Sequence, residues 1–164
     1  AAVEQSVTET TPDAPILHAD SIVTVESPEM IQNARVLVIE DGPTLTHGGT
    51  DRGAGAVAAE TYGAAELLDP RPVAVGTIAD TLERYDHLED VVPAIGYTDR
   101  QIEDLEATIR AADPDVVVAG TPHDLERQVD VEVPVVRAHY HLQPRDFSFA
   151  AFLDDHATEL GLDA

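Results

Sequence analysis

The segment IEDGPTLTHGG, residues 39–49, contains side chains that could bind a phosphate or a carboxylate. Threonine hydroxyls and the backbone N–H groups of a glycine-rich turn donate hydrogen bonds to anions, and a helix starting near Asp51 would add the positive end of its dipole. A histidine that titrates near neutral pH could act as an acid or a base. The candidates for anion binding are Thr44, Thr46, Gly48 and Gly49, and those for catalysis are Asp41 and His47.

Acidic side chains near the same place could hold a metal ion. Glu40 and Asp41 end an apolar run, and Asp69 ends the next run along the chain. Mg²⁺ is normally bound by one or two carboxylates together with substrate oxygens. We therefore expect Mg²⁺ as a cofactor, with Glu40, Asp41 and Asp69 as its protein ligands.

Later runs end in further anion-binding candidates. Arg71 and Arg137 could make bidentate contacts with an anion, and Thr121 could add a hydroxyl. Each of the arginines has a structural alternative: Arg71 would pair with Asp69 in a rigid turn, and Arg137 would pair with a structural acid. The glycines, in the same way, would only provide turn geometry and close helix packing.

The elements that position these residues follow from valine-rich runs without clean alternation, each followed by a turn and then helical spacing. Such runs predict strands buried on both faces of a parallel sheet. They span residues 35–40, 65–69, 115–120 and 134–140. Ligands of open α/β sheets bind beyond the carboxyl ends of the strands, so we expect the candidates to share one edge. The predicted fold is α/β, a three-layer Rossmann-like domain with a mostly parallel sheet of about four to five strands.

Helices are predicted between and after these strands. The segments are 51–63, 76–88, 98–113 and an amphipathic stretch over 147–162. The helix at 98–113 has the clearest pattern, because Thr98 and Gln101 form a capping box and the apolar residues repeat at helical spacing.

Composition restricts the classes of function. The chain has 32 acidic residues against 9 basic ones and a net charge of -23, and every basic residue is arginine. This surface is typical of a haloarchaeal cytoplasm, so we expect a halophilic, cytoplasmic protein that binds neither nucleic acid nor membranes. The absence of cysteine excludes disulfides and thiolate metal sites. No apolar stretch approaches the roughly 20 residues of a membrane span.

Three segments resemble signatures of an archaeal and bacterial family of predicted GTPases related to cyclic 2,3-diphosphoglycerate synthetase. They are IEDGPTLTHGG at 39–49, GAAELLDPRP at 63–72 and GTPHDL at 120–125, within a resemblance that covers about residues 15–143. In this family a P-loop NTPase domain with a Walker A motif and an Asn-Lys-x-Asp motif precedes the region that is similar to this chain. Neither motif occurs here, so the resemblance implies that GTP or ATP binds to an upstream domain of a longer protein.

The resemblance also implies a domain organisation and a function. Residues 1–25 would be the last helix and strand of the NTPase domain, residues 26–145 the α/β domain, and residues 146–164 a C-terminal amphipathic helix. The α/β domain would be the acceptor side of a phosphoryl-transfer enzyme that binds a small phosphorylated or multi-anionic metabolite. The alternative is a non-catalytic anion-sensing or interaction domain that regulates an attached GTPase. The expected partners are the metabolite, the upstream NTPase domain and, as an open possibility, further copies of the chain.

Overall fold

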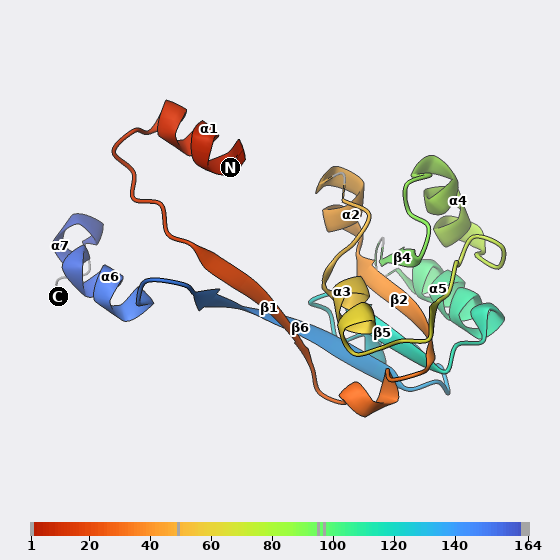
Figure 1. Cartoon of the computed structure of the whole chain (residues 1–164). Coiled ribbons are helices and arrows are strands. Elements are labelled where there is room, and N and C mark those ends of the chain that lie inside the picture. The colour runs from red at the N-terminus through yellow and green to blue at the C-terminus, as the bar shows by residue number, and fades with distance from the viewer. Residues whose placement is uncertain (1, 49, 95, 97, 162–164) are drawn as a thin grey trace. The chain divides into compact units, whose positions relative to one another are not determined.

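The computed structural model describes residues 2–48, 50–94, 96 and 98–161 (Figure 1). By its internal contacts the chain divides into two compact units. One unit is Val23–Tyr140, and the other combines the segments before Val23 and after Tyr140. The predicted boundaries near residues 25 and 145 stay a prediction. All the candidate residues named above lie within the range of the first unit.

A six-stranded sheet organises the fold, with the order β1-β6-β5-β2-β3 and with β4 also paired to β2. The strands are β1 (Ala19–Val25), β2 (Arg35–Asp41), β3 (Glu66–Leu67), β4 (Val91–Ala94), β5 (Val116–Gly120) and β6 (Val135–Pro144). Strand β2 pairs in parallel with β3, β4 and β5, and β5 pairs in parallel with β6. The α/β fold with a mostly parallel sheet is therefore confirmed, with at least one strand more than expected.

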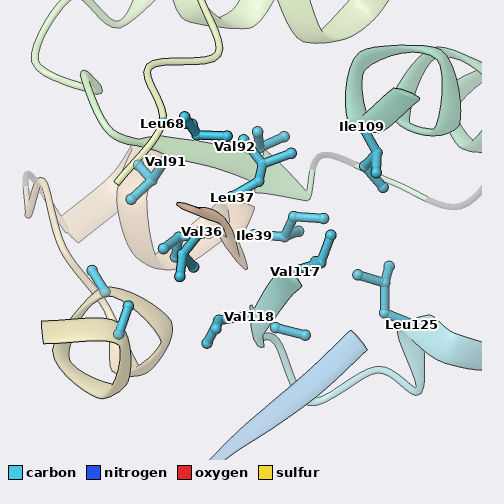
Figure 2. Packing of buried hydrophobic residues seen from close by; sticks show 14 of the residues in the cluster. Val36, Leu37, Ile39, Leu68, Val91, Val92, Ile109, Val117, Val118 and Leu125 are labelled. Carbon is cyan, nitrogen blue, oxygen red and sulfur yellow. The ribbon is translucent and has the colours of Figure 1, made fainter. Parts of the chain in front are cut away.

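Alternation along β2 divides the core into two layers. Gly55 of α3 (Ala54–Thr61) packs close to Val38, and α3 lies against β2 and β5. Leu37 and Ile39 point to the opposite face, where Figure 2 shows Ile39 and Val117 on the side of the sheet that carries Ile109 of α5 (Asp99–Ala112). All five of these large side chains are buried. Helices thus cover both faces of a sheet whose central strands are apolar over Val36–Ile39 and Val116–Ala119, as is typical of parallel sheets.

The remaining helices match the predicted segments to different degrees. They are α1 (Ala2–Thr10), α2 (Gly42–Gly48), α4 (Gly76–Arg84), α6 (Phe149–Asp155) and α7 (Ala157–Leu160), with short 3₁₀ turns at Pro28–Met30 and Leu125–Arg127. The capping box of α5 is present, since Thr98 accepts from the Gln101 backbone and the Gln101 side chain accepts from the Thr98 backbone. The predicted helix at 147–162 is divided at His156, which ends α6 and precedes α7.

Two local predictions differ from the structure. The expected glycine-rich turn at 44–49 is helical up to Gly48, because Pro43 is compatible with a first helical turn and the Thr46 hydroxyl donates to the Gly42 carbonyl. Strand β4 was absent from the prediction, since its four residues include a proline and follow a run of acids.

No helix in the described part of the chain is long and apolar enough to cross a membrane.

Candidate functional site

A pocket of about 390 Å³ lies where β2 and β5 end beside β6. It is lined by Asp41, Thr44, Ala54, Gly120, Thr121, Pro122, Arg137, Ala138, His139 and Tyr140. Four of the predicted site residues are among them: Asp41 at the end of β2, Thr44 on α2, Thr121 just after β5, and Arg137 near the start of β6. A larger cavity of about 450 Å³ lies around Ile109 and Val133 but contains none of the predicted residues. The smaller pocket is therefore the candidate site.

Asp41 and Thr44 form one wall of this pocket. Asp41 is the last residue of β2, and α2 begins directly after it, so Thr44 lies one helical turn further on. The Thr44 hydroxyl donates to Asp41 Oδ2 at 3.0 Å. Asp41 is half-buried, and this hydrogen bond restricts the orientation of its carboxylate. The wall thus offers a negative charge held in place by a neighbouring hydroxyl.

Arg137 and Thr121 form the opposite wall. The β5–β6 register pairs Arg137 with Ala119, two residues before the buried Thr121. Arg137 Nη2 donates to the Pro122 carbonyl, which directs the guanidinium along the end of β5. Among the described residues no carboxylate makes an ion pair with Arg137. A guanidinium has five N–H donors, so Arg137 keeps donors for an anion.

Glu40 lies beside the pocket with its side chain buried, only 1% exposed. Its Oε1 accepts hydrogen bonds from the N–H of Gly53 at 3.1 Å and from the N–H of Ala56 at 2.8 Å. Burial raises the pKa of Glu40, and the repulsion from Asp41 adds to this, while the N–H groups at the start of α3 oppose it. The positive end of α3, expected to face a ligand, is therefore occupied by a carboxylate of the protein itself.

Three glycines make room for the Glu40 carboxylate. A Cβ added to Gly53 or Gly120 would lie 2.4 Å or 2.1 Å from Glu40 Oε2, and one added to Gly55 would lie 2.9 Å from Val38 and 3.1 Å from Glu40 Oε1. No side chain can occupy such positions without displacing its neighbours. The glycines at the start of α3 thus serve close packing.

Asp69 and Arg71 are not among the residues that line the pocket. The Arg71 guanidinium makes a bidentate contact with the Asp69 carboxylate, with distances of 2.8 Å to Oδ1 and 2.7 Å to Oδ2, and its Nη1 lies 3.8 Å from Glu89. The hydrogen bonds from Arg71 lower the pKa of Asp69. This is the internal ion pair of the structural alternative, and it occupies the guanidinium that the anion would need.

Three other predicted residues, Thr46, His47 and Gly48, lie on α2 and are not among the residues that line the pocket. His47 is exposed, and its Nδ1 lies 3.1 Å from the Thr46 hydroxyl, which itself donates to the Gly42 carbonyl. Gly48 ends the helix, and Gly49 lies outside the described residues. Catalysis by His47 and anion binding by Thr46, Gly48 and Gly49 stay predictions.

His139 and Tyr140 also line the pocket, and of these two only His139 was expected at this edge from the sequence. His139 Nε2 lies 3.5 Å from Glu26, and Tyr140 is 70% exposed. Their position two and three residues after Arg137 on one strand was the available signal. No group of three or more His, Asp or Glu side chains suited to a metal occurs in the part of the chain that the structure describes. A Mg²⁺ ion here would take Asp41 as its ligand and its other oxygens from substrate and water.

Comparison with known proteins gives one informative match. The chain is 51% identical over 141 residues to the arginine synthetase ArcE of Thermococcus kodakarensis, and the match covers 86% of this chain and 32% of the relative. The chain is a relative of a synthetase. It spans about a third of the length of that protein. No protein-family model and no solved structure matches.

Proposed function

We propose that this chain is the substrate-binding α/β part of a nucleotide-dependent synthetase and that the pocket between Asp41 and Arg137 binds an anionic group of the substrate. The observation that supports this most is the convergence of a guanidinium, two hydroxyls and a carboxylate from β2, α2, the end of β5 and β6. Open α/β sheets bind their ligands at this edge. The similarity to a synthetase supports the class of reaction.

The pocket's charges favour a substrate that has both an anionic group and a hydrogen-bond donor or bound cation. Arg137 would hold a carboxylate or phosphate, with the Thr121 hydroxyl beside it. Asp41 would face an ammonium or guanidinium group, or a Mg²⁺ ion shared with substrate oxygens. The relative's name states that it is an arginine synthetase, and an amino acid combines a carboxylate with basic groups. The resemblance to cyclic 2,3-diphosphoglycerate synthetase favours a phosphorylated acceptor instead. An amino acid and a phosphorylated acceptor both carry the anionic group that Arg137 would hold.

GTP or ATP would bind to an NTPase domain elsewhere in a longer protein, which we propose as the partner of this chain. The relative is about three times as long as the matched region, which leaves room for such a domain. In phosphoryl transfer the protein contributes mostly positioning and neutralisation of charge. The role proposed for this pocket is therefore to hold the acceptor in place.

A ligand titration tests this proposal. Thermal unfolding of the full chain would be followed with inorganic phosphate, 2,3-diphosphoglycerate, arginine and ATP, in dilute buffer and in about 2 M KCl, where screening is strong. We expect stabilisation by at least one of the first three and none by ATP alone.

The matched control compares two arginines. Arg137→Ala should abolish the stabilisation, while Arg127→Ala, at an exposed arginine paired with Asp124, should leave it unchanged. Equal stabilisation of both variants would place the anion elsewhere, and no response of the wild-type chain to any anion would contradict the proposal.

A further inference from the structure

Among the residues that the structure describes, Glu40 is the one acid that is fully buried, and its position joins two elements that border the pocket. Its carboxylate accepts from the first turn of α3 through Gly53 and Ala56, and it also packs against Gly120 at the end of β5. The same oxygen, Oε2, would lie 2.4 Å from a Cβ added to Gly53 and 2.1 Å from a Cβ added to Gly120. One buried group thus contacts helix and strand together.

Two glycines that contact this carboxylate, Gly53 and Gly120, are adjacent in the chain to residues of the pocket wall. Ala54 lies between Gly53 and Gly55, and Thr121 follows Gly120. Glu40 itself precedes Asp41. A displacement of the carboxylate would therefore shift three parts of the wall at once.

Helix α3 has no cap of its own that could replace Glu40. Its N-cap residue is Gly53, which has no side chain, and no side-chain cap bond occurs there. The first N–H groups of a helix need an acceptor, and a carboxylate also interacts favourably with the positive end of the helix dipole. Glu40 supplies that acceptor from a neighbouring strand.

We propose that Glu40 is a positioning residue of the pocket, whose carboxylate holds the start of α3 and the end of β5 at the spacing that substrate binding requires. This rests on the proposed function for the pocket, but it assigns to Glu40 a role different from metal ligation. A positioning role depends on an acceptor oxygen at the right place, whereas ligation of Mg²⁺ depends on negative charge.

Two conservative variants separate these roles. Glu40→Gln keeps the side-chain length and an acceptor oxygen but loses the charge. Glu40→Asp keeps the charge but shortens the side chain by one methylene, so that its oxygens no longer reach both N–H groups. Glu83→Gln, at an exposed position on α4, is the matched control. All variants would be studied in the full chain, which avoids reliance on Glu40→Ala, a variant at risk of not folding.

The readouts are the affinity for inorganic phosphate and for arginine and the hydrogen-exchange rates of the Gly53 and Ala56 amides. We expect Glu40→Gln to keep affinity within about threefold of wild type and to keep both amides protected. Glu40→Asp should lose about tenfold in affinity and exchange these amides at least about tenfold faster. The reverse order, with Asp tolerated and Gln not, would overturn the positioning role in favour of charge.

Failure of this role can be told apart from failure of the proposed function. If wild type binds a probe and Glu40→Asp binds it equally well, the positioning role is wrong and the pocket assignment stands. If wild type binds neither probe, the proposed function fails, and amide exchange alone decides whether Glu40 holds α3. In that case, unchanged amide exchange rates in Glu40→Asp would also refute the proposal that Glu40 holds the start of α3.

Discussion

Two helices of this protein begin on a carboxylate supplied by another element, and the two sites differ mainly in burial. Glu40 of β2 accepts from the start of α3 inside the core, while Asp104 of α5 accepts from the Thr77 backbone at 2.8 Å and the Thr77 hydroxyl at 2.9 Å nearer the surface. A Cβ on Gly76 would lie 2.3 Å from the Asp104 carboxylate, just as Gly53 and Gly120 accommodate Glu40.

The pKa shifts of these two acids have opposite signs. Hydrogen bonds from Thr77 lower the pKa of Asp104, whereas burial raises the pKa of Glu40 despite similar bonds. The same kind of contact therefore stabilises the charged acid at the surface and does not offset its desolvation in the core. Only the buried acid borders the candidate site.

Gly120→Ala should have the largest effect on stability. The new Cβ would lie 2.1 Å from Glu40 Oε2 and 2.5 Å from the Gly55 backbone nitrogen, and a backbone atom cannot swing aside. We expect a loss of about 3 kcal/mol or more in the free energy of unfolding, measured by urea denaturation. Gly63→Ala is the control, since its φ is +79° and nothing lies near its Cβ, so it adds backbone strain of about 1 kcal/mol alone. Equal losses would show that the space around Glu40 is not limiting.

Gly76→Ala should cost less, about 1–2 kcal/mol, although its Cβ would lie almost as close to a carboxylate. The Asp104 carboxylate is the end of a surface side chain and can rotate away, so the cost is its lost contact with Thr77 plus strain at φ +52°. Combining the change with Asp104→Ala should be less than additive in thermal or urea unfolding. Full additivity would show that the glycine and the acid act independently.

Asp104→Ala should destabilise the chain by about 1 kcal/mol at neutral pH, the usual effect of losing a helix cap. Because the folded pKa is lowered, this contribution is present above the ordinary pKa of 3.8 and is lost as the pH falls through the folded value. Unfolding curves of wild type and variant should thus converge in acid. A difference that persists below that pKa would mean that charge is not its source.

Glu40→Gln should have the smallest effect at acid pH, within about 1 kcal/mol, because an acceptor oxygen remains for Gly53 and Ala56. Because the pKa of Glu40 is raised in the folded chain, the folded chain binds more protons than the unfolded chain at pH values above 4.5, the ordinary pKa. The wild-type chain therefore loses stability as the pH rises from 4.5 through the folded pKa. The stability of Glu40→Gln relative to wild type should therefore increase with rising pH, whereas that of Asp104→Ala should decrease. Parallel pH profiles would contradict a buried, titrating Glu40.

The sequence predicted elements whose signals are local. The capping box at Thr98 and Gln101 and the apolar repeat after it identify α5 because all the interacting groups lie within a few turns. The strand ends that meet at the pocket were also predicted, since parallel strands place their carboxyl ends together. Strand β4 was missed because Val91–Ala94 is too short to show a period.

The burial and hydrogen-bond partners of Glu40 could not be predicted from local sequence patterns. Its hydrogen-bond donors lie 13 and 16 residues away, and Gly120 lies in a different strand, so no local pattern indicates that this acid is buried and accepts these hydrogen bonds. Arg71 likewise had two possible roles in the sequence, and its bidentate contact with Asp69 is visible only in the structure. Burial and side-chain pairing depend on packing that a single sequence does not show.

We propose that the anion binds between Asp41 and Arg137, and an NMR titration of the full chain would locate the bound anion. Amide and Arg Nε–Hε resonances would be followed as inorganic phosphate or arginine is added. We expect saturable shifts at Thr44, Thr121 and the Arg137 side chain, and little change at Arg71, whose guanidinium already pairs with Asp69. Saturable shifts centred on Asp69 and Arg71, with Arg137 unaffected, would contradict it.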